Sequence, residues 1–397
     1  MLDKKSPQGT NHHNEIFMKK HQLAAMVLSA LSAGILISCS KPADEAQPTA
    51  NKQAADVKPA TESSETAADT TAVKAIALSD ASAESYLKQV ADTQIISAYK
   101  NVVEQSQALN ALATQSCQAD GSVAADKLAA LRAQWLQLAK AWAQAEIIGF
   151  GPAMDSMSNL YINYYPDERG LVHQGVIDLI AANPNLTPEQ LASESAIVQG
   201  IPGLEEVLYA NDSLDKSQCQ YVISASAALA NRLDKVSQDW QASPQSLLSY
   251  GSPDDNKEGL NRWVNSILAL VETTKSTSLD QPLGITGNKK GHLPADAAGQ
   301  SREIITAKVA ALNKALTDPA LVAILSENGQ DTLADKLSTL LSDTSTLLAQ
   351  LPEDLATATP EQQKALYDKL TELAQVVKRQ LMPTLGVQVG FNSTDGD

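Results

Sequence analysis

Large apolar side chains recur at alternating steps of three and four residues along most of this chain of 397 residues. The clearest run is Leu128, Leu131, Trp135, Leu138 and Trp142. This spacing places the side chains on one face of an α-helix. The same rhythm returns at 87–112, 222–240, 260–271, 304–316, 333–351 and 366–381. No run of β-branched residues alternates with a period of two, so the sequence predicts an all-α fold.

The net charge and the histidine content limit the classes of function that the chain can have. The chain has 46 acidic and 30 basic residues, a net charge of −16, and only five histidines. This balance argues against a nucleic-acid partner, whose backbone needs clustered Lys and Arg. Three of the histidines lie within the first 21 residues, which leaves only His173 and His292. The sequence therefore excludes a His-rich metal site or an HExxH zinc motif, and leaves two candidate imidazole bases.

The N-terminal residues have the order of a signal peptide. A basic stretch at 18–21 precedes an apolar run of fifteen residues, Leu23 to Ile37, which is short for a membrane span and typical of a signal core. The run ends in Leu-Ile-Ser-Cys39, which is similar to the bacterial lipoprotein signal, with Cys39 as the lipidated residue. An ordinary secreted protein with an incidental cysteine is the alternative.

We therefore predict a signal peptide over residues 1–38, of which 1–17 form an upstream extension. The lipid on Cys39 would anchor the chain in the cell envelope, facing the periplasm. The inner-membrane retention signal is an Asp after the cysteine, and Ser40 stands there instead. This favours the outer membrane.

Composition divides the rest of the chain. Residues 39–78 are rich in Ala, Thr, Glu, Asp, Lys and Pro and hold almost no large apolar side chains, so we expect a disordered linker. We predict a first helical bundle over 79–252, a second over 253–385 and a tail over 386–397. The Gly- and Pro-bearing segment 280–299 is an alternative connection between the two halves.

Two cysteines remain after Cys39. Cys117 and Cys219 have no CxxC partner, so the sequence gives no support to a redox or zinc role for them. Outside the cytoplasm, an even pair of cysteines is expected to form a disulfide.

The first candidate site residue is Glu146. One further step of four along the Leu128–Trp142 face reaches it, so its carboxylate is expected to point into the bundle. An unpaired buried charge is strongly unfavourable, so Glu146 should meet a cation, a metal or hydrogen-bond donors. Gly151 and Pro152 then end the helix. A solvated Glu at a frayed helix end is the alternative.

The second candidate is Glu205, which shares a helical face with Ile201 and Leu208. Pro202 has no amide hydrogen, and Gly200 weakens the helix before it. Either a kink or a fresh helix start with Pro202 in its first turn follows. Both leave backbone polar groups unpaired beside Glu205.

These segments together resemble one known family. The motifs are Trp135, Trp142 and Glu146, then Phe150-Gly151-Pro152, then Gly200-x-Pro202-x-x-Glu205, then Pro282-Leu283-Gly284. They look like the imelysin-like family of bacterial envelope proteins, from about residue 80 to 385. The resemblance implies two packed helical bundles, a site where they meet, and a role in iron uptake or iron homeostasis.

The chain departs from the family at one position. The family signature is GxHxxE, once interpreted as a metallopeptidase motif, and this chain keeps Gly200 and Glu205 but carries Pro202 in place of the His. An HxxE peptidase needs His ligands and an activated water. The chain resembles a branch with GxPxxE, for which we expect a ligand-binding surface and no hydrolysis.

Three further residues are candidates beside these motifs. Tyr165 and Asp167 belong to a polar aromatic turn that could line the site, and an ordinary surface turn is the alternative. Arg302 opens a helix and could pair with a buried carboxylate or an anionic ligand, or lie on the surface. The predicted ligand-binding residues are thus Trp142, Glu146, Gly151, Pro152, Tyr165, Asp167, Gly200, Pro202, Glu205 and Arg302.

Our leading hypothesis is a lipid-anchored periplasmic protein that binds iron, free or chelated, and works with iron-uptake components. Ferric iron favours carboxylate and phenolate oxygens, so Glu146 and Glu205 are the predicted metal ligands and Tyr165 could add a third. A metallopeptidase is one alternative. A non-catalytic scaffold that recruits an outer-membrane partner through its acidic surface is the other.

Overall fold

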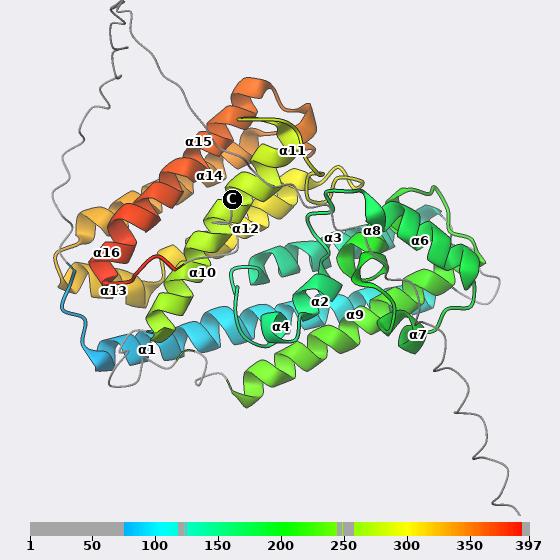
Figure 1. Cartoon of the computed structure of the whole chain (residues 1–397), viewed down its shortest axis with the longest axis horizontal. Coiled ribbons are helices and arrows are strands. Elements are labelled where there is room, and N and C mark those ends of the chain that lie inside the picture. Colours follow the sequence, from blue (N-terminus) through cyan, green and yellow to red (C-terminus); the bar gives the residue numbers. More distant parts are fainter. Residues whose placement is uncertain (1–74, 118–122, 124, 244–247, 249–257, 391–397) are drawn as a thin grey trace, which may run out of the picture. The chain divides into compact units, whose positions relative to one another are not determined.

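A computed structural model describes residues 75–117, 123, 125–243, 248 and 258–390 (Figure 1). Every described residue belongs to one compact unit, 68–397. The predicted signal peptide, the lipidation of Cys39 and most of the predicted linker lie outside the described residues. The predicted boundary between two bundles at 252–253 lies outside them as well, so these stay predictions.

Within the described ranges the chain forms helices and no β-strand, which confirms the predicted all-α fold. The α-helices are α1 (Asp80–Val90), α2 (Ser97–Ser116), α3 (Ala125–Ala145), α4 (Pro152–Asp155), α5 (Ser158–Ile162), α6 (Leu171–Ala182), α7 (Pro188–Ala192), α8 (Gly200–Tyr209), α9 (Lys216–Ala242), α10 (Glu258–Lys275), α11 (Gln281–Leu283), α12 (Ser301–Leu316), α13 (Pro319–Glu327), α14 (Asp331–Gln350), α15 (Pro360–Val376) and α16 (Met382–Leu385). Ala91–Ile96, Ser276–Asp280 and Val377–Leu381 are π-helical, and Ala196–Val198 and Leu355–Thr357 are short 3₁₀ turns.

The helices pack in two groups. In the first, α2 lies against α3 and α9, and α8 contacts both α3 and α9. A disulfide joins Cys117, at the end of α2, to Cys219 in the first turns of α9. Bulky aromatic residues such as Trp135 and Trp240 are fully buried within this group.

The second group consists of α10, α12, α14 and α15, each packed against two of the others (Figure 1). Helix α12 also packs along α3, and this contact joins the two groups. One hydrophobic core runs through both, from Trp135 on α3 to Trp263 on α10 and Leu312 on α12. The junction between α3 and α12 therefore holds the groups together and positions the site described below.

The folded part extends slightly beyond both of the ends predicted from the sequence. The amide of Ile76 donates to the carbonyl of Thr384 at 2.8 Å, and Val387 is buried. These residues, assigned from the sequence to the linker and the tail, pack with the helices. Across the described ranges, no single helix is both long enough and apolar enough to span a membrane. The consecutive helices α12 and α13, which meet at a bend of 44°, satisfy both criteria only when they are taken together.

Candidate functional site

A cavity of about 240 Å³ lies where α3, α6, α8 and α12 meet the loop 284–300. Six of the residues predicted from the sequence line it, namely Trp142, Glu146, Tyr165, Asp167, Pro202 and Glu205. Trp135, Ile201 and Ile304 add apolar wall. The cavity thus brings together side chains that are up to 173 positions apart, from Trp135 to Lys308.

Glu146 directly follows α3 at the cavity wall, and its two carboxylate oxygens have different partners. Lys308 on α12 places its Nζ atom 2.9 Å from Oε2, and Asn163 donates from Nδ2 to Oε1 at 3.0 Å. Lys308 is only 4% exposed and also donates to the hydroxyl of Ser278 at 3.1 Å. The carboxylate of Glu146 therefore meets a cation and a donor, both of which the protein itself supplies.

Helix α8 begins afresh at Gly200, and Pro202 stands in its first turn. Gly200 has a φ of +70°, and a Cβ atom there would lie 2.3 Å from the carbonyl oxygen of Ile162. Only glycine fits this close approach of two backbone segments. The fresh start, rather than a kink, directs Glu205 into the cavity one turn later.

Glu205 is an acid of the cavity wall whose pKa differs from the ordinary value of a glutamate. It lines the cavity and accepts a hydrogen bond from the amide of Ala298 at 3.1 Å. Burial raises the pKa of Glu205 to about 8, and the negative charges of Glu206 and Asp296 act in the same direction. At neutral pH the carboxyl of Glu205 is therefore mostly protonated.

Tyr165 and Asp167 lie on the turn before α6. The hydroxyl of Tyr165 lies 3.0 Å from the carbonyl oxygen of His292 and 3.2 Å from that of Thr277. Burial raises the pKa of Tyr165 far above its usual value, so the residue is a phenol that donates and not a phenolate. Asp167 accepts from the amide of Val172 at 2.8 Å, near the start of α6.

Four predicted site residues do not line the cavity: Gly151, Pro152, Gly200 and Arg302. Gly151 and Pro152 form the start of α4, where Gly151 takes a φ of +78°. Gly200 acts through the backbone contact described above.

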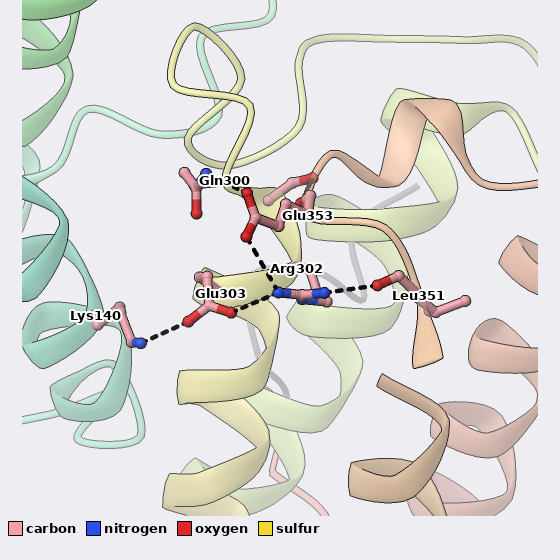
Figure 2. Close-up of polar contacts among 7 residues, drawn as sticks. Lys140, Gln300, Arg302, Glu303, Leu351 and Glu353 are labelled. Atoms are coloured by element: carbon pink, nitrogen blue, oxygen red, sulfur yellow. Dashed lines mark hydrogen bonds and ion pairs between the residues drawn. The ribbon is translucent and has the colours of Figure 1, made fainter. Parts of the chain in front are cut away.

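Arg302 is not part of the cavity lining, and Figure 2 shows its polar contacts. Its guanidinium donates to the carbonyl of Leu351 at 2.7 Å and to Glu303 at 3.1 Å, and Glu353 lies 3.7 Å away. Glu303 in turn pairs with Lys140 of α3 at 2.6 Å. The loop 284–300 ends where α12 begins. This network fixes the beginning of α12 against α3 on one side and against the segment after α14 on the other.

Three charged residues of the cavity were not among the predicted site residues: Lys308, Glu206 and Asp296. His173 and His292 also line it, and the sequence offered them only as candidate imidazole bases. The position of Lys308 could have been predicted from the sequence, because it stands between Ile304 and Leu312 at steps of four and therefore on the same apolar helical face. Glu206 pairs with Nδ1 of His173 at 2.9 Å. Asp296 comes from the irregular loop, where no periodicity indicates the direction of a side chain.

The donor set does not fit a bare metal ion held by Glu146 and Glu205. In the part of the chain that the structure describes, no group of three or more His, Cys, Asp or Glu side chains could hold a metal. A metal at Glu146 would have to displace the ammonium of Lys308, and Glu205 holds a proton. The zinc site of a peptidase needs three protein ligands and an open position. These residues do not form one.

The described residues define an all-α protein with an acidic cavity where two groups of helices meet. The family model of Imelysin, also named Peptidase_M75, matches residues 95–379. The chain belongs to the imelysin family, which confirms the resemblance inferred from its motifs.

Two solved structures are similar to this chain. An imelysin-like protein from Psychrobacter arcticum 273-4 is 58% identical, with a TM-score of 0.79, over 80% of this chain and all of that one. A putative iron-regulated protein A precursor from Parabacteroides distasonis ATCC 8503 is 11% identical, with a TM-score of 0.62, over 77% of this chain and 95% of that one. The second likeness concerns the fold alone. No curated protein matches the sequence.

Proposed function

We propose that this protein is an envelope lipoprotein that binds an iron-related ligand in the cavity between its two helix groups and serves iron uptake. The cavity itself carries the proposal. It is lined by apolar and aromatic side chains and by several carboxyl groups, and these are held by helices from both groups. A largely apolar pocket with a few convergent polar groups is typical of a small-molecule site.

Iron enters the proposal through two observations. The motifs are those of a family for which the resemblance implies a role in iron uptake, and the protein from Parabacteroides distasonis, which shares the fold, is named as iron-regulated. Because Glu146 is already paired with Lys308, we favour iron carried within a ligand over a bare ion bound by Glu146 and Glu205.

Peptidase activity forms no part of the proposal. Position 202 holds Pro where a His ligand would be needed, and the described residues offer no set of three metal ligands. For the alternative of a scaffold for an outer-membrane partner, the described part of the chain offers no specific contact surface.

Uptake of radioactive iron by cells that lack the gene tests the proposal. The cells would carry the wild-type gene, Ala297→Trp or Ala349→Trp. Ala297 is exposed on the loop at the cavity and a tryptophan there would obstruct it, whereas Ala349 is exposed on α14 outside this cavity. We expect wild type and Ala349→Trp to restore uptake and Ala297→Trp to fail. Full uptake without the gene, or full rescue by Ala297→Trp, would overturn the proposal.

A further inference from the structure

We infer that the cavity selects a small organic cation, a protonated amine carried on an apolar body, by placing its charge beside Glu205, Glu206 and Asp296. This inference deepens the proposed function and rests on it, since both take the cavity as the ligand site. It names the chemical class of the ligand, or of the arm of a larger ligand, that enters.

The charge balance of the cavity wall is the first argument. Five carboxyl groups and one lysine line it among the described residues. The lysine, Lys308, is already paired with Glu146 at 2.9 Å, and Asp167 is satisfied by the amide of Val172. The remaining carboxyl groups belong to Glu205, Glu206 and Asp296.

Within the described ranges, none of these three acids forms an ion pair with a Lys or an Arg. Glu206 contacts His173 at 2.9 Å and Asp296 contacts His292 at 3.6 Å, but each of these rings is more than half exposed, so solvent screens the contact. Burial raises the pKa of Glu205, and the negative charges of Glu206 and Asp296 add to this rise. A positive charge beside Glu206 and Asp296 would offset their negative charges and favour ionisation of Glu205, whereas an anion would add to the negative charge.

The walls around the acids are the second argument. Trp135, Trp142, Ile201, Leu293 and Ile304 make most of the lining apolar. Aromatic rings attract cations as well as apolar groups. The volume of about 240 Å³ lies just below the range of about 300–1,000 Å³ that holds drug-sized ligands. The cavity therefore suits a small molecule, or a single arm of a large one.

A third observation is independent of charge. Trp142 lines the cavity and is only 5% exposed, and its indole N–H has no hydrogen-bond partner among the described residues. Buried donors are rarely left unpaired, so such a group calls for an acceptor from elsewhere. An oxygen or nitrogen acceptor on the body of the ligand, separate from its ammonium group, would fill this role, which a bare metal cation cannot.

A series of three probes of nearly equal shape tests the inference. We would titrate the full chain, purified in detergent, with 2-(4-hydroxyphenyl)ethylammonium, 2-(4-hydroxyphenyl)ethanol and 3-(4-hydroxyphenyl)propanoate, which share a phenol oxygen as acceptor, and follow the heat of binding. We expect the ammonium ion to bind about tenfold more tightly than the alcohol, and the carboxylate to bind least. Equal affinities, a preference for the carboxylate, or no binding of the ammonium ion at millimolar concentration would overturn the inference.

Charge-neutral variants locate the selectivity. The double variant Glu206→Gln and Asp296→Asn keeps the side-chain shapes, so we expect it to lose the preference for the ammonium ion and to retain its affinity for the alcohol. Asp343→Asn, on the outer side of α14, is the control and should behave as wild type. An unchanged preference in a folded double variant contradicts the inference. The single variant Asp296→Asn, altered only on the loop, replaces the double variant if that fails to fold.

The result separates this inference from the proposed function. If the obstructing Ala297→Trp variant abolishes iron uptake and the cavity does not distinguish the three probes, the proposed function stands and the cationic class is wrong. If the cavity prefers the ammonium probe and iron uptake does not depend on the gene, the inference of a cation site is correct and the proposed role in iron uptake is wrong.

Discussion

The ammonium of Lys308 lies 2.9 Å from the carboxylate of Glu146, and this contact crosses from α12 to the end of α3. Lys308 is buried, and Glu146 retains 21% side-chain exposure. The ion pair therefore joins the two helix groups at the wall of the cavity. It also explains how a carboxylate on an apolar helical face is accommodated: its counter-charge is the ammonium of Lys308.

Replacement of the lysine should be strongly destabilising. Lys308→Met leaves the carboxylate of Glu146 without its cation, and we expect a loss of about 3 kcal/mol in the free energy of unfolding. The double variant Lys308→Met with Glu146→Leu should recover part of this loss, because no charge remains unpaired. Urea denaturation measures all three. Lys369→Met, which breaks an exposed pair with Asp343, is the control and should change stability by less than about 1 kcal/mol. A loss for Lys308→Met as small as that of the control would contradict the role given to this pair.

Gly200 should tolerate no side chain. Gly200→Ala would combine a φ of +70° with a Cβ atom 2.3 Å from the carbonyl oxygen of Ile162, so α8 would have to shift. We expect a loss of at least about 2 kcal/mol and weaker ligand binding, because Glu205 follows in the next turn.

Gly329→Ala is the matched control for this change. Gly329 has a nearly equal φ of +69° but no atom within 4 Å of the added Cβ, so only the backbone strain of about 1 kcal/mol remains. Thermal and urea unfolding compare the two variants. Equal losses would show that the contact with Ile162 adds nothing.

Helical periodicity explains why part of the site could be predicted. Glu146 and Glu205 each continue an apolar stripe, and a stripe fixes which way a side chain points. The fresh helix start at Pro202 was one of two open interpretations, and the close contact of Gly200 with Ile162 decides between them. Both effects are local in the sequence.

The remaining part of the site depends on contacts between distant segments. Arg302 was expected to pair with a buried carboxylate or an anionic ligand, or to lie on the surface. It pairs with Glu303, and its shortest hydrogen bond is to the carbonyl of Leu351, which no local pattern indicates. Asp296 reaches the cavity from an irregular loop. Lys308 could have been found as a charge within an apolar stripe, although its partner Glu146 lies 162 positions earlier.

The lipid anchor is a prediction that fractionation can test. If Cys39 carries the lipid, the wild-type chain should sediment with the outer membrane, and Cys39→Ser should release it into the soluble fraction or leave the signal uncleaved. Labelling with a radioactive fatty acid reports the modification directly. Cys117→Ser, which removes a cysteine of the disulfide, is the control and should remain labelled. Labelled Cys39→Ser protein would contradict the assignment.

Glu205 should make the stability of the protein fall as the pH rises. Its pKa is about 8 in the folded protein against 4.5 for an ordinary glutamate, so between these values the folded chain holds a proton that the unfolded chain has released. Stability therefore decreases across this window, by up to about 1.4 kcal/mol per pH unit, and the contribution is fully present only below pH 4.5.

Glu205→Gln removes this titration and keeps the shape of the neutral carboxyl group. Urea unfolding of both proteins at pH 5 and pH 8.5 gives the comparison. We expect the variant to gain roughly 4 kcal/mol relative to wild type between the two conditions, because the wild type alone must bury a carboxylate at the higher pH. Glu303→Gln is the contrasting control. The pKa of Glu303 is lowered by its hydrogen bond to Lys140, so that variant should gain nothing relative to wild type over the same interval. A constant difference between wild type and Glu205→Gln at the two pH values would show that Glu205 is ionised in the folded protein throughout.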